Sequence, residues 1–379
     1  IKSEKCFLNL TKPQKKIISD EILGFELGGV GLSKSKKIEF KKLKAKLSKL
    51  SSSFEENLLD SVNNFSLLIE DKQKIKGIPK DVLEQAKINA KKQNKKGWLF
   101  TLDFPCYLPI MQYADNRELR KQIYYAYATK ASELNDKKTD NTKNINQILI
   151  HKKRLANLLG FSDFASMALV TKMANSSKEV IKFLENLANK AKSFADKDMV
   201  DLRNYGQKLK ISDIEAWDIA YLSEKIKEDR FKFSEHEIKN YFPDFKVIHG
   251  LFKVVEKIYG LHIFEEKVEV WHEDVKFYKI LNSSNQTIGS FYLDLYARKN
   301  KRGGAWMDEA ISKFKFSNEE ALPVAYLTCN FSQPIHNNPS LLTHDEVITL
   351  FHEFGHGLHH LLTEINDYGV SGIQGVEWD

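Results

Sequence analysis

Two histidines four residues apart, His352 and His356, flank a glutamate in the sequence His352-Glu353-Phe-Gly-His356. Positions four apart on an α-helix lie on one face, so both imidazoles can bind the same zinc ion. A glutamate next to the first histidine can deprotonate a zinc-bound water. The pattern therefore predicts a metallopeptidase site, with one Zn²⁺ held by His352 and His356 and with Glu353 as the catalytic base.

The predicted zinc site requires that these residues lie on a helix, and the sequence indicates where that helix begins. Thr343 followed by Glu346 is typical of a capping box, which predicts a helix beginning near His344. Apolar residues then recur at spacings of three and four and predict one buried face, formed by Val347, Phe351, Phe354, Leu358 and Leu361. Gly355 and Gly357 each cost roughly 1 kcal/mol relative to alanine inside a helix. Their presence indicates that something packs closely there, either a neighbouring element or the wall of a substrate channel.

The alternative is an exposed helix whose histidines only contact solvent. The capped, amphipathic context, with both histidines on one side, favours the zinc site. His359 and His360 follow directly and are more typical of structural histidines than of ligands. His344, Asp345 and His359 are candidates for orienting the site without contacting zinc, and the sequence does not choose among them.

A zinc site of this kind needs a third protein ligand. One known pattern places a glycine and a histidine three and six residues after the second histidine, but His359 and Leu362 occupy those positions. Glu364 lies about two turns beyond His356 on the same predicted helix, too far along to reach the ion. Glu377 is the last glutamate of the sequence and is the candidate by spacing alone, which would make this a different zinc hydrolase with a complete site.

Longer stretches of sequence resemble the thimet oligopeptidase family, which includes the bacterial oligopeptidase A enzymes. The resemblance rests on residues 107–113, 115–120, 291–298, 301–308, 323–331 and 342–359. It implies a mainly α, two-lobed metallopeptidase fold with a small β-sheet next to the HExxH helix. It also implies His352 and His356 as zinc ligands, Glu353 as the base, and short peptide substrates admitted to a deep channel between two helical lobes.

The same resemblance argues against Glu377 as the third zinc ligand. In that family the third ligand is a glutamate that would fall about three residues after Asp379. The resemblance therefore predicts an internal piece of a longer enzyme, lacking a first helical segment and the C-terminal helices. On that basis the piece alone is expected to hold zinc weakly and to be inactive. The remaining alternative is a non-catalytic helical fragment or binding module.

The arrangement of elements is predicted to be helical until about residue 265. Amphipathic helices are expected over 40–58 and 145–158, and Ser176 with Glu179 predicts the start of another. The apolar stripe of that third helix is predicted to be core: Val180, Leu184, Leu187, Ala191 and Phe194. A β-hairpin is predicted from 277–281 and 288–293, joined by the turn residues 282–285, and a further strand from 324–328.

Two domains are expected, an N-terminal helical part over 1–110 and the catalytic domain over 111–379. Because a sheet precedes the zinc helix, an edge strand beside the site could hold an extended peptide by backbone pairing.

Composition fits a cytoplasmic enzyme. Cys6, Cys106 and Cys329 are far apart and are expected to be reduced thiols. No apolar run is long enough to cross a bilayer, and residues 1–6 do not resemble a signal peptide, so no membrane partner is expected. The net charge of +7 is spread over the chain, and lysine clusters such as Lys91-Lys92 are more typical of a solvated helix than of a nucleic-acid site. The oligomeric state is not predicted.

Overall fold

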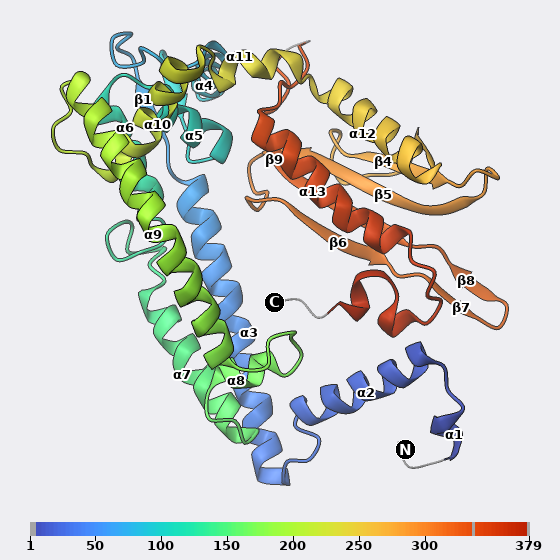
Figure 1. The fold of residues 1–379 in the computed structure, drawn as a ribbon. Coiled ribbons are helices and arrows are strands. Elements are labelled where there is room, and N and C mark those ends of the chain that lie inside the picture. The colour runs from blue at the N-terminus through green and yellow to red at the C-terminus, as the bar shows by residue number, and fades with distance from the viewer. Residues whose placement is uncertain (1–4, 336–337, 377–379) are drawn as a thin grey trace.

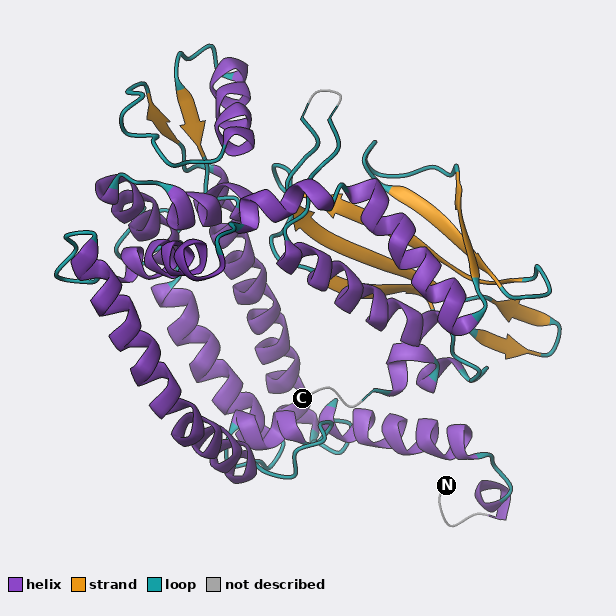
Figure 2. Ribbon diagram, turned by 45° about the horizontal axis from the view of Figure 1, so that its top comes forward, coloured by secondary structure: helices purple, strands orange, loops and turns teal. Residues whose placement is uncertain are grey.

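Two bodies stand side by side in the computed structural model, which describes residues 5–335 and 338–376 (Figure 1). One body is a column of long helices with shorter helices at one end. The other is a mixed β-sheet with two helices on one face, and the turned view shows the same division (Figure 2). The prediction of a mainly α fold, with a small sheet next to the HExxH helix, is confirmed.

The helical body contains most of the first 231 residues. Two helices, α1 (Lys5–Leu8) and α2 (Lys12–Leu27), extend from its foot to a position below the second body (Figure 1). The helices of the body itself are α3 (Lys34–Asn63), α4 (Lys80–Lys92), α5 (Phe104–Tyr113), α6 (Arg117–Ala128), α7 (Thr142–Leu158), α8 (Phe164–Leu169), α9 (Ser177–Lys208) and α10 (Ala216–Phe231). The helices predicted over 40–58 and 145–158 are thus confirmed as parts of α3 and α7. A two-stranded sheet of β1 (Leu67–Ile69) and β2 (Trp98–Phe100) interrupts the predicted all-helical stretch. The predicted boundary between the two domains, at residue 110, falls inside helix α5. The division into these two domains stays a prediction.

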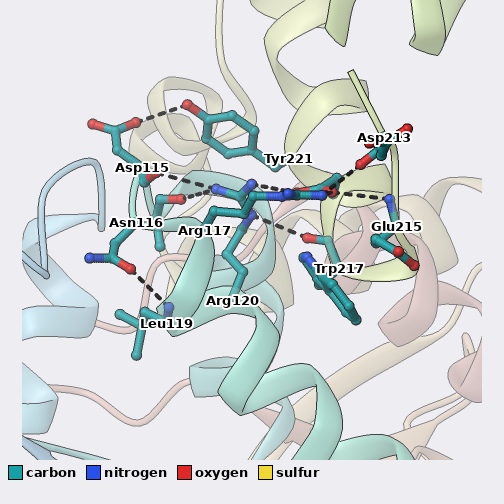
Figure 3. A network of polar contacts seen from close by, with 11 residues as sticks. Asp115, Asn116, Arg117, Leu119, Arg120, Asp213, Glu215, Trp217 and Tyr221 are labelled. Atoms are coloured by element: carbon teal, nitrogen blue, oxygen red, sulfur yellow. Dashed lines mark hydrogen bonds and ion pairs between the residues drawn. The ribbon is translucent and has the colours of Figure 1, made fainter. Parts of the chain in front are cut away.

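A buried ion network joins α6 to α10 in this body (Figure 3). The Asp218 carboxylate, which is fully buried, accepts hydrogen bonds from Arg120 at 2.8 Å and from Arg117 at 2.7 Å. Arg120 is also fully buried, and it donates to the carbonyl oxygens of Ala114 and Trp217. Burial opposes ionisation of Asp218, but the hydrogen bonds from Arg117 and Arg120 outweigh it, so the pKa of this carboxyl is lowered.

The predicted core stripe of α9 is wrong. Ser176 does cap the helix, and its hydroxyl accepts from the Glu179 amide at 3.2 Å. However, Leu184 and Leu187 are each 54% exposed, and Phe194 is 67% exposed. An apolar stripe predicts which face of a helix is suited to burial. It does not predict which element packs against that face, and in α9 no described element covers these side chains.

The second body is built on a five-stranded sheet. Helix α11 (Glu235–Ile238) and the 3₁₀ helix η1 (Lys239–Tyr241) lead into it from the helical body. Its elements are α12 (Asp244–Tyr259), β3 (His262–Glu266), β4 (Lys276–Leu281), β5 (Thr287–Tyr296), β6 (Trp306–Ile311), β7 (Phe314–Phe316), β8 (Glu319–Ala321), β9 (Val324–Phe331), α13 (His344–Leu361), η2 (Tyr368–Val370) and η3 (Gly372–Gly375).

The strand order is β3-β4-β5-β9-β6, with β5 and β9 parallel and the other pairs antiparallel. The predicted hairpin is confirmed as β4 and β5, and the predicted strand as β9. Strand β7 pairs with β8 in a separate small hairpin.

Alternation along the strands places one set of side chains against α12 and α13. Phe291 and Leu293 from β5, and Leu327 and Cys329 from β9, are buried there, and Phe291 meets Phe354 of α13 at 5.4 Å between ring centroids. The core thus holds α13 against the middle of the sheet. Strand β6 is left at the sheet edge beside this helix.

Candidate active site

Helix α13 begins where the sequence predicts. The Thr343 hydroxyl accepts from the Glu346 amide at 3.1 Å, and the Glu346 carboxylate accepts from the Thr343 amide at 2.7 Å. This reciprocal pair satisfies two of the amide groups that a helix start leaves unbonded, which fixes the register of the turns that follow. His352 and His356 lie on the two turns in the middle of the helix.

The two imidazoles face one another. Their Nε2 atoms are 3.2 Å apart, and the ring planes are nearly perpendicular, at 88°. Two nitrogens bound to one tetrahedral zinc at about 2.05 Å lie roughly 3.3 Å from each other. The separation of the two nitrogens therefore matches that of two ligands of one zinc ion.

No described residue close to this pair is a candidate for the remaining ligand position. Among residues 5–335 and 338–376, no group of three or more histidine, cysteine, aspartate or glutamate side chains could hold a metal. Glu377, the candidate by spacing, lies outside the described residues. Glu364 follows the end of α13 and is exposed, so it does not extend the face that carries the histidines.

Glu353 points to a different side from its neighbours. It is buried, at 8% exposure, whereas His352 is exposed and His356 is half-buried. One residue is about 100° of rotation on a helix, which directs Glu353 from the histidine face toward the sheet. Burial and the nearby Glu353 charge raise the pKa of the Cys329 thiol on β9 to about 12, in keeping with this placement.

The apolar face predicted for this helix needs one correction. Phe354 and Leu361 are buried as expected, but Phe351 is 38% exposed, and Leu350, which was not predicted, is fully buried. Leu350, Phe354 and Leu361 follow one another at spacings of four and seven, so they share a face, and Phe351 is rotated away from it.

The two glycines of the motif differ. A methyl group at Gly357 would lie 3.0 Å from Leu327 Cδ2, so this glycine allows close contact between α13 and β9, as predicted. A methyl group at Gly355 would meet nothing within 4 Å. The close packing predicted for Gly355 is therefore wrong, and the helix surface between the two histidines is open.

The other histidines of α13 differ in their surroundings. His360 is fully buried, and its Nε2 donates to the Ile311 carbonyl oxygen at 2.9 Å, which confirms a structural histidine. His359 and His344 are exposed, and the His344 ring lies against Phe242 at 6.4 Å. Whether His344 or His359 orients the site stays a prediction.

A cleft of about 940 Å³ lies beside the first turns of α13. Asp345 and Thr349 line it, and their spacing from His352 and His356 puts all four residues on one face of the helix. The opposite wall comes from the helical body, with Leu58 and Leu59 of α3 among the lining residues. The cleft thus lies between the two bodies and adjoins the histidine face.

Within this cleft, Glu346 is half-buried. Burial raises the pKa of its carboxyl, although hydrogen bonds from Thr343 and the charge of Lys239 act in the opposite sense. The Glu346 carboxylate already serves the helix cap, whereas the carboxylate of Asp345, which also lines the cleft, is exposed.

Strand β6 was missed by the sequence analysis. Among the described strands it pairs with β9 alone, on one side, and the segment just before it, Gly303 to Ala305, lines the cleft. Its last residue, Ile311, is the partner of His360. The free edge of β6 therefore runs beside α13 from the cleft to the turn that follows His356. The charged residues Asp308 and Glu309 obscure the alternation that would have revealed this strand.

A family model covers the stretch of chain that holds this site. The model described as Peptidase family M3 matches residues 110–379, and the chain belongs to this family of metallopeptidases. Family M3 is zinc-dependent in general.

The chain is also similar to proteins named oligopeptidase A. It is 45% identical to oligopeptidase A of Escherichia coli (strain K12) over 98% of this chain and 56% of that protein. It is 44% identical to oligopeptidase A of Haemophilus influenzae, over all of this chain and 56% of that protein. A probable cytosolic oligopeptidase A of Arabidopsis thaliana is 36% identical, over 98% of this chain and 55% of that protein. The chain spans about half the length of these curated relatives.

A solved structure described as an oligoendopeptidase F matches 94% of this chain and 52% of its own. Its TM-score is 0.43 and its sequence identity 13%, which is too distant to carry an argument. No described helix of the present structure is both long and apolar enough to span a membrane.

Proposed function

We propose that the full-length protein is a zinc-dependent endopeptidase that hydrolyses short oligopeptides in the cytoplasm. The observation that carries this proposal is the 3.2 Å separation of the His352 and His356 Nε2 atoms on a helix that also holds Glu353, in a chain of family M3. The relatives named oligopeptidase A support the substrate class. The name of the cytosolic relative supports the location, although an Arabidopsis thaliana relative is named organellar.

The proposed roles follow from position. When bound, zinc lowers the pKa of a coordinated water to about 7 and polarises the scissile carbonyl. His352 and His356 would hold the ion through Nε2. Glu353 accepts the proton of the attacking water and passes it to the leaving amine. Its burial limits the positions open to the carboxylate, which favours transfer over a short distance.

Residues 111–379 are proposed as the catalytic domain. Zinc sites of this class have three protein ligands, and no described residue supplies the third. The proposal therefore concerns the full-length protein, and no membrane or nucleic-acid partner is part of it.

The substrate is proposed to bind as an extended strand. The free edge of β6 offers backbone groups beside the His352–His356 face, and the 940 Å³ cleft continues from the start of that strand. Backbone pairing is independent of side chains, so it aligns peptides of many sequences. Replacing single peptide bonds of a substrate by N-methyl amides should raise KM at the paired positions. If KM depended strictly on one side chain and on no backbone position, this binding mode would be wrong.

The function is tested by separating metal binding from proton transfer. In the full-length protein, His356→Ala should lose both stoichiometric zinc and peptide cleavage. Glu353→Gln should keep zinc while kcat falls by about 10² to 10⁴, the contribution typical of general acid–base catalysis.

His249→Ala serves as the matched control, because this exposed histidine lies on α12, outside the helix that carries the site, and is expected to change zinc content little. Cleavage that persists unchanged in Glu353→Gln would overturn the proposal. Zinc loss in Glu377→Gln would instead favour a different zinc hydrolase that uses Glu377 as its third ligand.

A further inference from the structure

A second cavity lies on the other face of the sheet, away from α13. Its volume is about 590 Å³, within the range of small-molecule sites. Side chains from β5, β6 and β9, from the segment between β5 and β6, and Trp271 line it. It is separate from the histidine pair, and although it shares Lys301 and Arg302 with the lining of the peptide cleft, the proposed peptidase mechanism does not use it.

Its floor is a turn held in one conformation. The Lys301 ammonium donates to the carbonyl oxygens of Asp294 and Tyr296 and to the Asp294 carboxylate, all within 3.1 Å. The Asn330 side-chain amide donates to the backbone carbonyl oxygens of Arg302 and Gly304. Because these bonds fix the backbone on both sides, the side chains of the turn project from a rigid frame.

The charge of this cavity is unbalanced. Arg298, Lys299, Lys301 and Arg302 line it, against the two carboxylates of Asp294 and Asp308. Asp294 is already saturated, since it accepts two bonds from Arg298 at 2.6 and 2.7 Å, one from Lys301, and one from Trp271 at 3.2 Å. With Asp308 included, the four positive side chains still exceed the two carboxylates by two charges, and this excess, next to the exposed Lys299 and Arg302, favours an anion.

Aromatic rings complete the cavity. Trp271 meets the ring of Tyr326 at 5.6 Å, both line the cavity, and Trp271 is 52% exposed. On the other side the Arg302 guanidinium lies 5.8 Å from the Trp306 ring. Exposed aromatic faces stack on planar ring systems, and an arginine beside them can bind phosphate in a bidentate manner. The combination fits a ligand that carries both an aromatic ring and phosphate.

We propose that this cavity binds a nucleoside phosphate, with the base against Trp271 and Tyr326 and the phosphates at Lys299 and Arg302. The site adjoins the peptide cleft, because Lys301 and Arg302 line both cavities. It also adjoins the contact between the two bodies, where the Asn63 side-chain amide of α3 donates to Asn300 at 3.2 Å. A ligand here would therefore be placed to influence peptide binding.

The test is direct binding, which requires neither zinc nor peptidase activity. ATP titrated into the metal-free full-length protein is expected to bind saturably by calorimetry and to quench tryptophan fluorescence. Adenosine and inorganic triphosphate should each bind more weakly than ATP. Equal affinity for triphosphate and ATP would overturn the proposed ligand class.

Variants place the binding in this cavity. Arg302→Gln and Trp271→Ala should each weaken ATP binding by about tenfold, the effect of one charge-assisted hydrogen bond or one stacked ring. Trp271→Phe should recover part of the loss. Arg203→Gln, at an exposed arginine on α9, is the matched control and should leave binding unchanged. Absence of saturable binding, or binding unaffected by Arg302→Gln and Trp271→Ala, would overturn the proposal.

Discussion

The His360 imidazole donates from Nε2 to the carbonyl oxygen of Ile311 at 2.9 Å and thereby joins α13 to the end of β6. His360 is fully buried, and Gly372, at φ +57, lies so close to the ring that a side chain there would overlap Nδ1. The helix that carries His352 and His356 and the strand proposed to pair with peptide are thus held at a fixed spacing.

Replacing His360 tests this link. His360→Leu leaves the Ile311 carbonyl oxygen without its buried donor, so the free energy of unfolding should fall by about 1–3 kcal/mol. In the full-length protein KM for peptides should rise, because the edge of β6 is no longer fixed beside α13. Chemical denaturation and steady-state kinetics measure the two effects. His360→Gln keeps a donor and should recover part of both, and unchanged stability in His360→Leu would contradict this role.

The two glycines of the motif form a matched pair. Gly355→Ala should raise the free energy of unfolding by about 0.5–1 kcal/mol, because alanine is the better helix former and the new methyl group meets open space. Gly357→Val should lower it by about 1–3 kcal/mol, because added side-chain atoms press on Leu327. Urea unfolding of both variants checks the contrast. Equal effects of the two changes would show that the contact at Gly357 does not matter.

Asp218 should control the acid sensitivity of the helical body. Its pKa is lowered in the folded protein, so its stabilising contribution is complete above its unfolded pKa of about 3.9 and is lost as the pH falls through the folded value. Asp218→Asn should cost about 3–5 kcal/mol at neutral pH, since it leaves Arg120 buried without its anion. Unfolding curves between about pH 3 and pH 7 test this. A variant as pH-dependent as the wild type across the acid range would contradict it.

The thiol of Cys329 should not react with alkylating reagents in the folded protein. Burial, together with the nearby charge of Glu353, raises the pKa of its thiol to about 12, and its side chain is fully buried. Iodoacetamide at neutral pH should therefore modify Cys329 only after denaturation, because the thiolate is the reactive form. Peptide mapping by mass spectrometry gives the extent at each cysteine. Rapid labelling under native conditions would show that the contact between β9 and α13 opens.

Local features of this chain were predictable from the sequence. The cap at Thr343, the common face of His352 and His356, and the hairpin of β4 and β5 depend on neighbours only a few residues apart. Their geometry follows from helix periodicity and turn chemistry, which act before any tertiary contact forms. The family resemblance, confirmed by the match to family M3, added the assignment to a family of metallopeptidases.

Features that depend on long-range contacts were predicted less well. Phe351 and the α9 stripe were predicted to be buried and are exposed, because periodicity does not say which element covers a face. Gly355 and Gly357 are indistinguishable in sequence, and only the approach of Leu327 separates them. The strand β6 was not predicted, because its pairing with β9 compensates for a charged sequence.

By itself, the sequence determined a capped helix with both imidazoles on one face, because positions i and i+4 of a helix lie on the same side. It also determined that the carboxylate of Glu353 is turned about 100° from His352, because the two residues are adjacent on the helix. Tertiary structure decided what lies opposite that face: a sheet edge, a cleft shared with the helical body, and a second cavity beyond the sheet. These arise where segments far apart in the chain pack together, and packing depends on the shape and volume of both partners rather than on the pattern of either one.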